Sequence, residues 1–600
     1  MTEIRKNKMK VRLTRKSRVA ARNGRPFAAN PLLAESMPRW RSSVVQCVLL
    51  CAFLGLAGRA IWLQVWSGEF LQKQGAYRYA RTLDLPGTRG RIVDRAGHTL
   101  ATSVPAVAVW AIPEDLREAD PDTLRRVAGA LQMEQAEIGK RIATAKNFVY
   151  LKNQVDPAVA RQLGAMKIRG IGFTDGFRRV YPQGDMASHV VGFVGREGRG
   201  LEGIELAHQA RLEGASGHRR VIKDRLGNIV EDVGTDLRPQ PGKESVLSIS
   251  SVVQYVASKQ LKEAVEKFQA KAGGAIVVDA HTGEILALAN YPSYDPNDAG
   301  ALKGPALRNR AITDIYEPGS VLKPFTVALA IDRGKVSADT MIDTGPGRYV
   351  INGAPISDTS AHGVISVSDV LRYSSNIGTA RLALGLPAKD MWEMFTSLGF
   401  GQQPQLGFPG AAAGRVRPYR SWRPIEQATM SYGNGIAVSL LQLARAYTIF
   451  TNDGKVVPLT LEKSAGAPAG TQVISPATAR TMREMLENVV VQGTARNGRI
   501  PGYRVGGKTG TAYKAENGRY VFPRKYIASF VGIVPMSAPR FIVAVMIDEP
   551  SGRYHYGGQV AAPAFVNIAS NVLQVTNVAP DAAIEDVLAA PEVHPDEIED

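Results

Sequence analysis

Three short motifs that lie far apart in the chain constrain its fold more than any other feature. They are Ser320-Val321-Leu322-Lys323, Ser374-Ser375-Asn376 and Lys508-Thr509-Gly510-Thr511. Each motif alone is common by chance, as a solvated helix face or a turn. In this order they provide a nucleophile with its base, a polar pair for proton relay, and a strand that binds an anion, which are the parts of a serine acyltransferase. The chain must therefore bring three distant segments into one cleft.

The first motif can supply both the nucleophile and the general base. A serine hydroxyl reacts poorly until a base removes its proton, so Lys323 would have to be neutral. Burial and a second cation, Lys508, would lower the lysine pKa from its ordinary value of about 10.4. Ser320 follows the helix-opening pair Pro318-Gly319. We expect Ser320 and Lys323, at i and i+3, on one helix face.

The second motif lies between two predicted helices, residues 366–372 and 377–384. A bend between them would direct Ser374 and Asn376 into the cleft. Ser374 can pass a proton between Lys323 and a leaving amine, and Asn376 can orient the amide of a substrate.

The third motif is expected on a strand, where Lys508 and Thr509 with Thr511 can bind a terminal carboxylate. The backbone N–H groups of Ser320 and Thr511 can stabilise an oxyanion. The predicted catalytic residues are Ser320, Lys323, Ser374 and Asn376. The predicted substrate-binding residues are Lys508, Thr509, Gly510 and Thr511.

A long apolar segment precedes these motifs. Residues 42–58 carry no charge, Arg59 interrupts, and residues 60–66 continue apolar apart from Gln64. As a helix, residues 42–66 would extend about 37 Å, enough to cross a bilayer. We predict one transmembrane helix, with Arg59 extending toward the headgroups. One alternative is a buried helix of a soluble protein. The other is a cleaved signal peptide, but the long basic leader and the lack of an Ala-x-Ala-like site disfavour it.

Charge is distributed unevenly along the chain, whose net charge is +18. Residues 1–41 carry +10 and residues 581–600 carry −8, which leaves +16 between them. The basic leader predicts a cytoplasmic N-terminus, with the rest of the chain beyond the inner membrane. The basic middle suits an anionic partner, but no zinc-finger or RNA-binding signature favours nucleic acid. Cys47 and Cys51 are the only cysteines, and both lie in the apolar segment, so we expect neither disulfides nor a metal site.

In the rest of the chain, the pattern of apolar residues changes near residue 243. Before it, strand-like and helical pieces alternate, beginning with a juxtamembrane helix at 71–79. After it come a hairpin around residues 281–283, helical runs at 437–450 and 477–490, and strands at 504–511, 527–534 and 541–547. These elements predict an α+β fold with a five-stranded antiparallel sheet packed with helices. The predicted segments are a basic cytoplasmic segment (1–41), a transmembrane helix (42–66), a first domain (67–242), a catalytic domain (243–577) and an acidic, disordered tail (578–600).

Gly198, Gly200 and Gly203 have the spacing of a dinucleotide-binding loop. They follow a stretch that we interpret as strand-like, 189–194, and precede a helical one, 204–212. Glu202 and Glu205 would place negative charge against a pyrophosphate at the helix start. No set of buried parallel strands surrounds the segment. We therefore predict a structural role for these glycines.

The ordered motifs resemble those of the high-molecular-mass class B penicillin-binding proteins, and the likeness covers nearly the whole chain after the apolar segment. The segment 89–94 (RGRIVD) is similar to one in the pedestal domain of that family. The likeness is greatest to the division-specific branch, and it rests on residues 198–205 (GRGLEGIE), 408–410 (FPG), 417–422 (RPYRSW) and 430–435 (MSYGNG). The elongation-specific branch has the same architecture and is the nearest alternative. At residues 248–251 (SISS), a serine-rich step from a strand to a helix, proteins of this family commonly have an aspartate. This difference concerns a helix cap.

The resemblance implies a peptidoglycan D,D-transpeptidase of septum formation. Ser320 would attack the penultimate carbonyl of a stem peptide ending in D-Ala-D-Ala, and an amine of a neighbouring strand would resolve the acyl-enzyme. β-Lactams would acylate Ser320. Residues 67–242 would form an elongated pedestal, dimerisation-type domain, and 243–577 the penicillin-binding transpeptidase domain. No metal or organic cofactor is expected. The glycan polymerase FtsW and other division proteins would be partners.

The motifs alone leave other functions open. A β-lactamase or a D,D-carboxypeptidase shares them but passes the acyl group to water. A β-lactam sensor would need several membrane spans. A non-catalytic division scaffold belongs to a different class, and the presence of all the expected catalytic side chains argues against a purely structural role.

Overall fold

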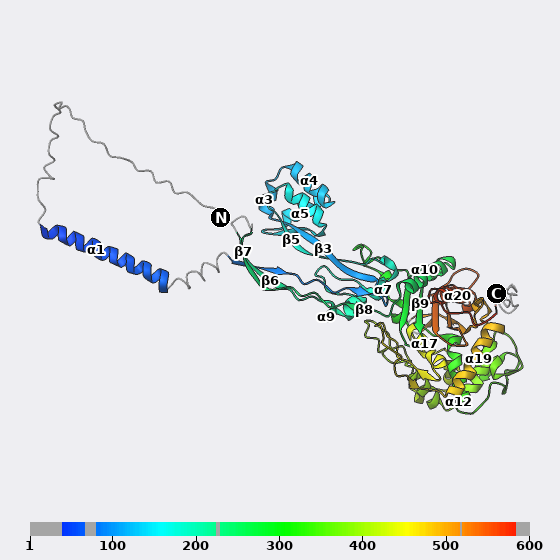
Figure 1. Ribbon diagram of the computed structural model, residues 1–600. Helices are drawn as coiled ribbons and strands as arrows, with labels where there is room; N and C mark the ends of the chain where they lie inside the picture. Colours follow the sequence, from blue (N-terminus) through cyan, green and yellow to red (C-terminus); the bar gives the residue numbers. More distant parts are fainter. Residues whose placement is uncertain (1–38, 67–79, 224–228, 517–518, 584–600) are drawn as a thin grey trace, which may run out of the picture. The chain divides into compact units, whose positions relative to one another are not determined.

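The computed structural model describes residues 39–66, 80–223, 229–516 and 519–583 (Figure 1). The chain divides into two compact units, Met1–Leu83 with Arg220–Gly234, and Asp84–Arg219 with Thr235–Asp600. The predicted juxtamembrane helix at 71–79, most of the basic segment and the acidic tail beyond residue 583 lie outside the described residues.

The apolar segment forms helix α1 (Arg39–Ile61), which continues as a π-helical turn, η2 (Trp62–Trp66). The most apolar 18-residue window within Arg39–Val65 has a mean hydropathy of 2.0, and none of the side chains in this helix is buried in the protein. Among the described residues this is the one helix long and apolar enough to cross a membrane. The helix begins three residues before the predicted start, because Arg39 to Arg41 continue its first turn.

A three-stranded sheet forms from segments far apart in the chain. Its strands pair in the order β1-β6-β7. Their bounds are β1 (Ala80–Leu85), β6 (Gly217–Lys223) and β7 (Ile229–Leu237).

The region before residue 248 contains a second sheet, built around the long strand β3 (Thr99–Ala111). This strand pairs with β2 (Ile92–Val93), β4 (Val149–Val155) and β5 (Ile171–Val180), and β2 also pairs in parallel with β8 (Ser245–Val246). Four helices pack with it around a small apolar core of their own. They are α3 (Pro113–Arg117), α4 (Pro121–Leu131), α5 (Gln135–Thr144) and α6 (Pro157–Ala165).

The predicted strand at 189–194 is wrong, because the structure has a short helix there, α7 (Ser188–Val191). Every residue from Ser188 to Phe193 is buried. The run therefore has no alternation of apolar and polar residues by which a strand could be told from a buried helix. The His189 ring contacts the carbonyl of Ala306 at 2.8 Å. This contact fixes the turn from a distant part of the chain.

The glycine-rich segment has the structural role that we predicted. It leads into α8 (Gly203–Ala207) and α9 (Gln209–Leu212). Glu205, fully buried, accepts from Arg89 Nε at 2.5 Å and from Arg179 Nε at 2.6 Å. A carboxylate buried between two arginines leaves no place for a phosphate at this helix start.

A five-stranded antiparallel sheet forms the centre of the second region, as predicted, with the strand order β10-β9-β21-β20-β17. The three late strands lie within two residues of the expected bounds, and β9 and β10 flank the predicted hairpin turn around residues 281–283. The five strands are β9 (Ala272–Asp279), β10 (Ile285–Tyr291), β17 (Gly506–Tyr513), β20 (Tyr526–Val534) and β21 (Phe541–Asp548). β17, which carries the third motif, is therefore an edge strand.

Helices cover both faces of this sheet. A side chain at Gly273 would meet Leu261 of α10 (Ser251–Lys267), whereas one at the next residue, Gly274, would meet α11 (Arg310–Thr313) and α17 (Leu440–Ala446). Because successive residues of a strand face opposite sides, α10 lies on one face and α11 with α17 on the other. α20 (Gly557–Val575) packs beside α10 (Figure 1).

Three further helix predictions compare closely with the structure. α19 (Pro476–Gln492) has the predicted Ser475 cap and first-turn proline, and α13 (Val367–Arg372) and α14 (Asn376–Leu384) flank the second motif. The predicted run at 437–450 is too long. It begins only after Ser439, which caps α17, and a second helix, α18 (Thr448–Thr451), follows. The shorter remaining helices of this region include α12 (Lys323–Asp332), α15 (Ala388–Ser397) and α16 (Pro424–Ser431).

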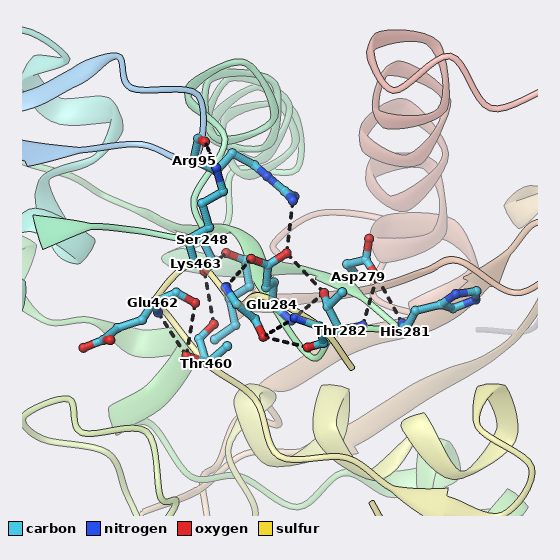
Figure 2. A network of polar contacts seen from close by, with 12 residues as sticks. Arg95, Ser248, Asp279, His281, Thr282, Glu284, Thr460, Glu462 and Lys463 are labelled. Carbon is cyan, nitrogen blue, oxygen red and sulfur yellow. Dashed lines mark hydrogen bonds and ion pairs between the residues drawn. The ribbon is translucent and has the colours of Figure 1, made fainter. Parts of the chain in front are cut away.

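A polar network joins the start of the chain's second unit to the β9–β10 hairpin (Figure 2). Glu284, almost fully buried, accepts from Arg95 Nη2 at 3.1 Å, from Thr282 Oγ1 at 3.2 Å and from the Ser464 backbone N–H at 2.8 Å. Lys463 Nζ donates to the Arg95 carbonyl at 3.0 Å. Arg95, Thr282 and Ser464 thus meet at one carboxylate.

Ser250 and Asp94 cap the start of α10 in place of the aspartate that proteins of this family commonly have. Ser250 accepts from the Val253 N–H at 3.5 Å, and the distant Asp94 carboxylate accepts from the Ser251 N–H at 3.0 Å. An acidic group at a helix N-terminus satisfies free N–H donors and favours the helix dipole.

Candidate active site

Ser320 lies in a short 3-10 turn, η5 (Gly319–Leu322), and Lys323 is the first residue of α12. The expected single helix is therefore two elements, but a 3-10 turn has three residues per turn and still aligns positions i and i+3. Gly319 has a φ of 58°, and a side chain there would meet the Thr511 carbonyl at 3.0 Å. Its absence lets the turn that holds Ser320 approach β17.

Ser374 occupies the bend between α13 and α14, and its φ of 59° is left-handed. Its hydroxyl accepts from Lys323 Nζ at 3.1 Å and from Lys508 Nζ at 2.9 Å, and Lys323 Nζ also donates to the Ser374 carbonyl. A left-handed non-glycine residue costs on the order of 1 kcal/mol or more. The bend thus holds the Ser374 hydroxyl between two amines.

Lys323 and Lys508 are both fully buried. Burial lowers the pKa of Lys323 to about 7, although the Asp358 carboxylate nearby favours its charged form. Burial and the charge of Lys323 together lower the pKa of Lys508 well below its ordinary value. The two ammonium groups therefore disfavour each other, and the pair holds a neutral amine near neutral pH. A neutral lysine amine can accept a proton from a serine.

The third motif follows β17 along the edge of the sheet. Gly510 is required by close packing, because a side chain there would lie 2.5 Å from Ser529 Oγ and 2.8 Å from the Pro318 carbonyl. Thr511 Oγ1 accepts from the Gly557 N–H, the first residue of α20, at 3.0 Å. On an edge strand, alternate backbone N–H and C=O groups have no strand partner and can bind a ligand.

A cavity of about 660 Å³ lies over these elements, within the range of small-molecule sites. Of the eight predicted site residues, Ser320, Ser374, Asn376, Thr509 and Thr511 line it. Lys323, Lys508 and Gly510 are buried and do not line it. Within the described part of the chain the Ser320 hydroxyl has no hydrogen-bond partner. The structure thus brings all eight residues together.

The sequence analysis missed Asp358. Its carboxylate accepts from Ser375 Oγ and from the Asn376 N–H, both at 2.5 Å, and from the Ile377 N–H at 3.0 Å. It therefore fixes the start of α14 and the bend that holds Ser374. No sequence signal could have identified it, because Asp358 lies in an irregular stretch 17 residues before Ser375.

Asn376 is more constrained than we expected. Its Nδ2 donates to the Ser357 carbonyl at 2.9 Å, so one of its two amide N–H donors is already used. The side-chain oxygen and the second N–H remain for a substrate amide.

The predicted site residues, the cavity and the sheet can be compared with those of known proteins. Residues 273–570 match the penicillin-binding protein transpeptidase domain, and residues 84–247 match the penicillin-binding protein dimerisation domain. The chain belongs to the class B penicillin-binding proteins. The resemblance that the motifs carried is thereby confirmed.

Relatives of this penicillin-binding protein align over most of its length. The probable peptidoglycan D,D-transpeptidase PenA of Neisseria meningitidis is 41% identical over 545 residues, 90% of this chain and 93% of PenA. Peptidoglycan D,D-transpeptidase FtsI of Escherichia coli is 38% identical over 552 residues, again 90% and 93%. The transpeptidase domain of penicillin-binding protein 3 from Burkholderia pseudomallei, a solved structure, has a TM-score of 0.52 and 51% identity, covering 56% of this chain and 97% of that domain.

Proposed function

We propose that this penicillin-binding protein is a peptidoglycan D,D-transpeptidase that crosslinks stem peptides through an acyl-enzyme on Ser320 during septal wall synthesis. The observation that carries the proposal is the pair of buried lysines that share the Ser374 hydroxyl beside the cavity of Ser320. The names of the relatives support the reaction. The segments that resemble the division-specific branch, such as residues 198–205 and 430–435, favour division over elongation.

Acylation begins when neutral Lys323 accepts the proton of Ser320. The Ser320 oxygen attacks the penultimate D-Ala carbonyl, and the N–H groups of Ser320 and Thr511 stabilise the oxyanion. Lys323 returns the proton through Ser374 to the amine of the terminal D-Ala, which leaves as the C–N bond breaks. β-Lactams acylate Ser320 in the same way, but their amine stays attached.

The substrate carboxylate sets the charge of the two lysines in this proposal. Lys508 and Thr509 with Thr511 bind the terminal carboxylate of the donor, and Asn376 orients the donor amide. An anion beside Lys508 raises the pKa of that amine. A cationic Lys508 then disfavours charge on Lys323, so substrate binding itself prepares the base.

The same proposal places the protein in the inner membrane through α1, with the N-terminus in the cytoplasm and the catalytic region in the periplasm. It divides the chain into a basic segment (1–41), a transmembrane helix (42–66), a pedestal (67–242), a transpeptidase domain (243–577) and an acidic tail (578–600). A transpeptidase of this kind requires a separate glycan polymerase, and FtsW is the proposed partner.

The test is intact-mass spectrometry of the full chain in detergent with benzylpenicillin, followed over time. We expect one stable adduct, absent in Ser320→Ala, whose thermal unfolding should match the wild type. Labelling that survives in Ser320→Ala would refute the assignment of the nucleophile. A transient adduct with hydrolysed drug would indicate a β-lactamase-like hydrolase, and a folded protein without any adduct would favour the scaffold role.

A further inference from the structure

The cavity has a strongly one-sided charge. No aspartate or glutamate is among the described residues that line it, whereas Lys267, Arg372 and Arg496 do. The two arginines lie together, since Arg372 Nη1 donates to Gln492 Oε1 at 3.4 Å and Arg496 Nη2 donates to the Gln492 carbonyl at 3.1 Å. Gln492 is the last residue of α19. Two guanidinium groups therefore meet at one end of this helix.

Neither guanidinium is fully used by the protein. Arg372 pairs with Asp369 at 3.1 Å and donates through Nη2 to the Tyr373 hydroxyl, whereas Arg496 has no acidic partner within the described part of the chain. The Nε of each arginine is buried and has no hydrogen-bond partner there. A guanidinium carries five N–H donors, and those without protein partners suit an anion such as a carboxylate.

The arginines lie toward the Thr509 end of the third motif. Thr494 and Thr509 hydroxyls are 3.4 Å apart, and the Thr494 N–H donates to the Arg372 carbonyl at 3.2 Å. The other end of β17 is aromatic. The Tyr513 and Tyr526 rings lie 5.4 Å apart, and Tyr526 stacks on His555 at 4.1 Å.

This order assigns a direction to the substrate and rests on the proposed function. If Thr509 helps to bind the terminal carboxylate and Thr511 stabilises the oxyanion, the donor peptide continues toward Tyr513. The leaving D-Ala then departs at the Thr509 end. The acceptor amine attacks from the position that the leaving amine vacated, because aminolysis is the reverse of that departure.

We propose that Arg372 and Arg496 form an acceptor subsite that binds a second carboxylate of the incoming amine. The carboxylate beside the acceptor amine takes the place of the D-Ala carboxylate at Lys508, and a carboxylate farther along the acceptor meets the two arginines. In the step itself the amine nitrogen forms an amide bond with the acyl carbon and the ester bond to Ser320 breaks. The amine proton passes through Lys323 to the Ser320 oxygen.

The test measures how the acyl-enzyme divides between aminolysis and hydrolysis. The full chain in detergent is acylated with a D-alanyl thioester donor and offered D-2-aminoadipate or D-norleucine, which have similar length but differ in the second carboxylate. We expect the wild type to prefer D-2-aminoadipate on the order of tenfold, the effect of one charge-assisted hydrogen bond. A wild type without this preference would overturn the proposal.

Variants locate the preference. Arg496→Gln and Arg372→Gln should each reduce the ratio of the two acceptors toward one, while Arg496→Lys should retain part of it. Arg480→Gln, on the exposed side of the same helix α19, is the matched control and should keep the wild-type ratio. A ratio that stays at the wild-type value in both glutamine variants would overturn the subsite.

A second carboxylate could also belong to the donor. Acylation is therefore measured with thioester donors that have or lack a carboxylate in the acyl part. Arginine variants that slow only the carboxylate-bearing donor, with the acceptor ratio unchanged, would assign the arginines to the donor and refute the acceptor subsite. Failure of the wild type to form any adduct with benzylpenicillin would instead refute the proposed function.

Discussion

At the scale of single residues, the site depends on two amines that share one hydroxyl. Lys323 and Lys508 both donate to Ser374 Oγ, and burial lowers the pKa of each. Asp358 favours the charged form of Lys323. The sequence predicted a lysine base with a lowered pKa. It could not predict that burial has the largest effect on this pKa, because burial depends on which segments pack over the amine.

The pKa of Lys323 predicts the pH dependence of acylation. Lys323 must be neutral to accept the Ser320 proton, and its pKa is about 7. The base form is therefore present above pH 7 and is lost as the pH falls. We expect the rate of adduct formation with benzylpenicillin to fall on the order of tenfold per pH unit below this value. Mass spectrometry between pH 5 and about pH 9 measures it, and a flat profile would contradict the assignment of the base.

Asp358→Asn tests the charge of the same site. Removing this carboxylate removes an interaction that raises the pKa of Lys323, so the limb of the pH profile should move to lower pH. Loss of the Asp358 contacts at the start of α14 would lower the rate at every pH, whereas the change in the Lys323 pKa moves the pH at which the rate falls. The position of this fall therefore distinguishes the two effects. A limb that moves to higher pH would show that another group controls acylation.

At the scale of elements, the site depends on how closely η5 packs against β17. Gly510 lies between the Pro318 carbonyl and Ser529 on β20, so the glycine of the third motif is a packing requirement. The sequence showed that a glycine stands there, but only the sheet order and the position of η5 explain it. The same contact brings the Ser320 turn beside Thr511.

Gly510→Ala should separate these two elements. Its new methyl group would lie 2.5 Å from Ser529 Oγ and 3.0 Å from Val321 Cγ1, and overpacking of this kind costs about 1–3 kcal/mol. We expect a lower unfolding temperature and slower acylation by benzylpenicillin. Gly139→Ala in α5, where a side chain meets no atom within 4 Å, is the control and should stabilise by about 0.5–1 kcal/mol. Equal unfolding temperatures for the two variants would contradict the packing argument.

The elements themselves were partly predictable. The strands β20 and β21 are largely apolar runs between turn residues, and α19 has a serine cap and a first-turn proline, so local signals sufficed. The prediction at 189–194 was wrong because the run from Ser188 to Phe193 is buried on every side, which hides the difference between a strand and a helix. The run at 437–450 misled because residues 437–438 pair with Arg415 and Tyr316 as isolated bridges before α17 begins. Both errors come from contacts made by distant residues.

At the scale of the second unit, the network around Glu284 joins the region that matches the dimerisation domain to the sheet of the transpeptidase region (Figure 2). Arg95, Thr282 and Ser464 all contact this one buried carboxylate. A buried carboxylate is stable only when it is paired and hydrogen-bonded. The network therefore contributes most to the stability of the protein when all of its members are in place.

Glu284→Gln should weaken this junction. Glutamine keeps the size of the side chain but removes the charge that pairs with Arg95, which is one-third exposed. We expect a loss of about 1–2 kcal/mol in stability, measured as the thermal unfolding of the full chain in detergent. Glu462→Gln, whose side chain is 57% exposed beside His208, is the control and should change stability by less than about 0.5 kcal/mol. A larger loss in the control would contradict the importance of the Glu284 junction.

The sequence by itself determined the family, the sheet strands and the apolar helix, and it predicted eight site residues that the structure brings together, because these depend on local composition and on motifs with fixed chemistry. Only the tertiary structure decided that two lysines share Ser374, that Asp358 fixes the bend, and that two arginines meet at Gln492 in the same cavity. Those facts depend on distances and burial between residues that lie from 17 to 134 positions apart in the chain. Such proximity arises from packing of the whole sheet and its helices, which no single stretch of sequence encodes.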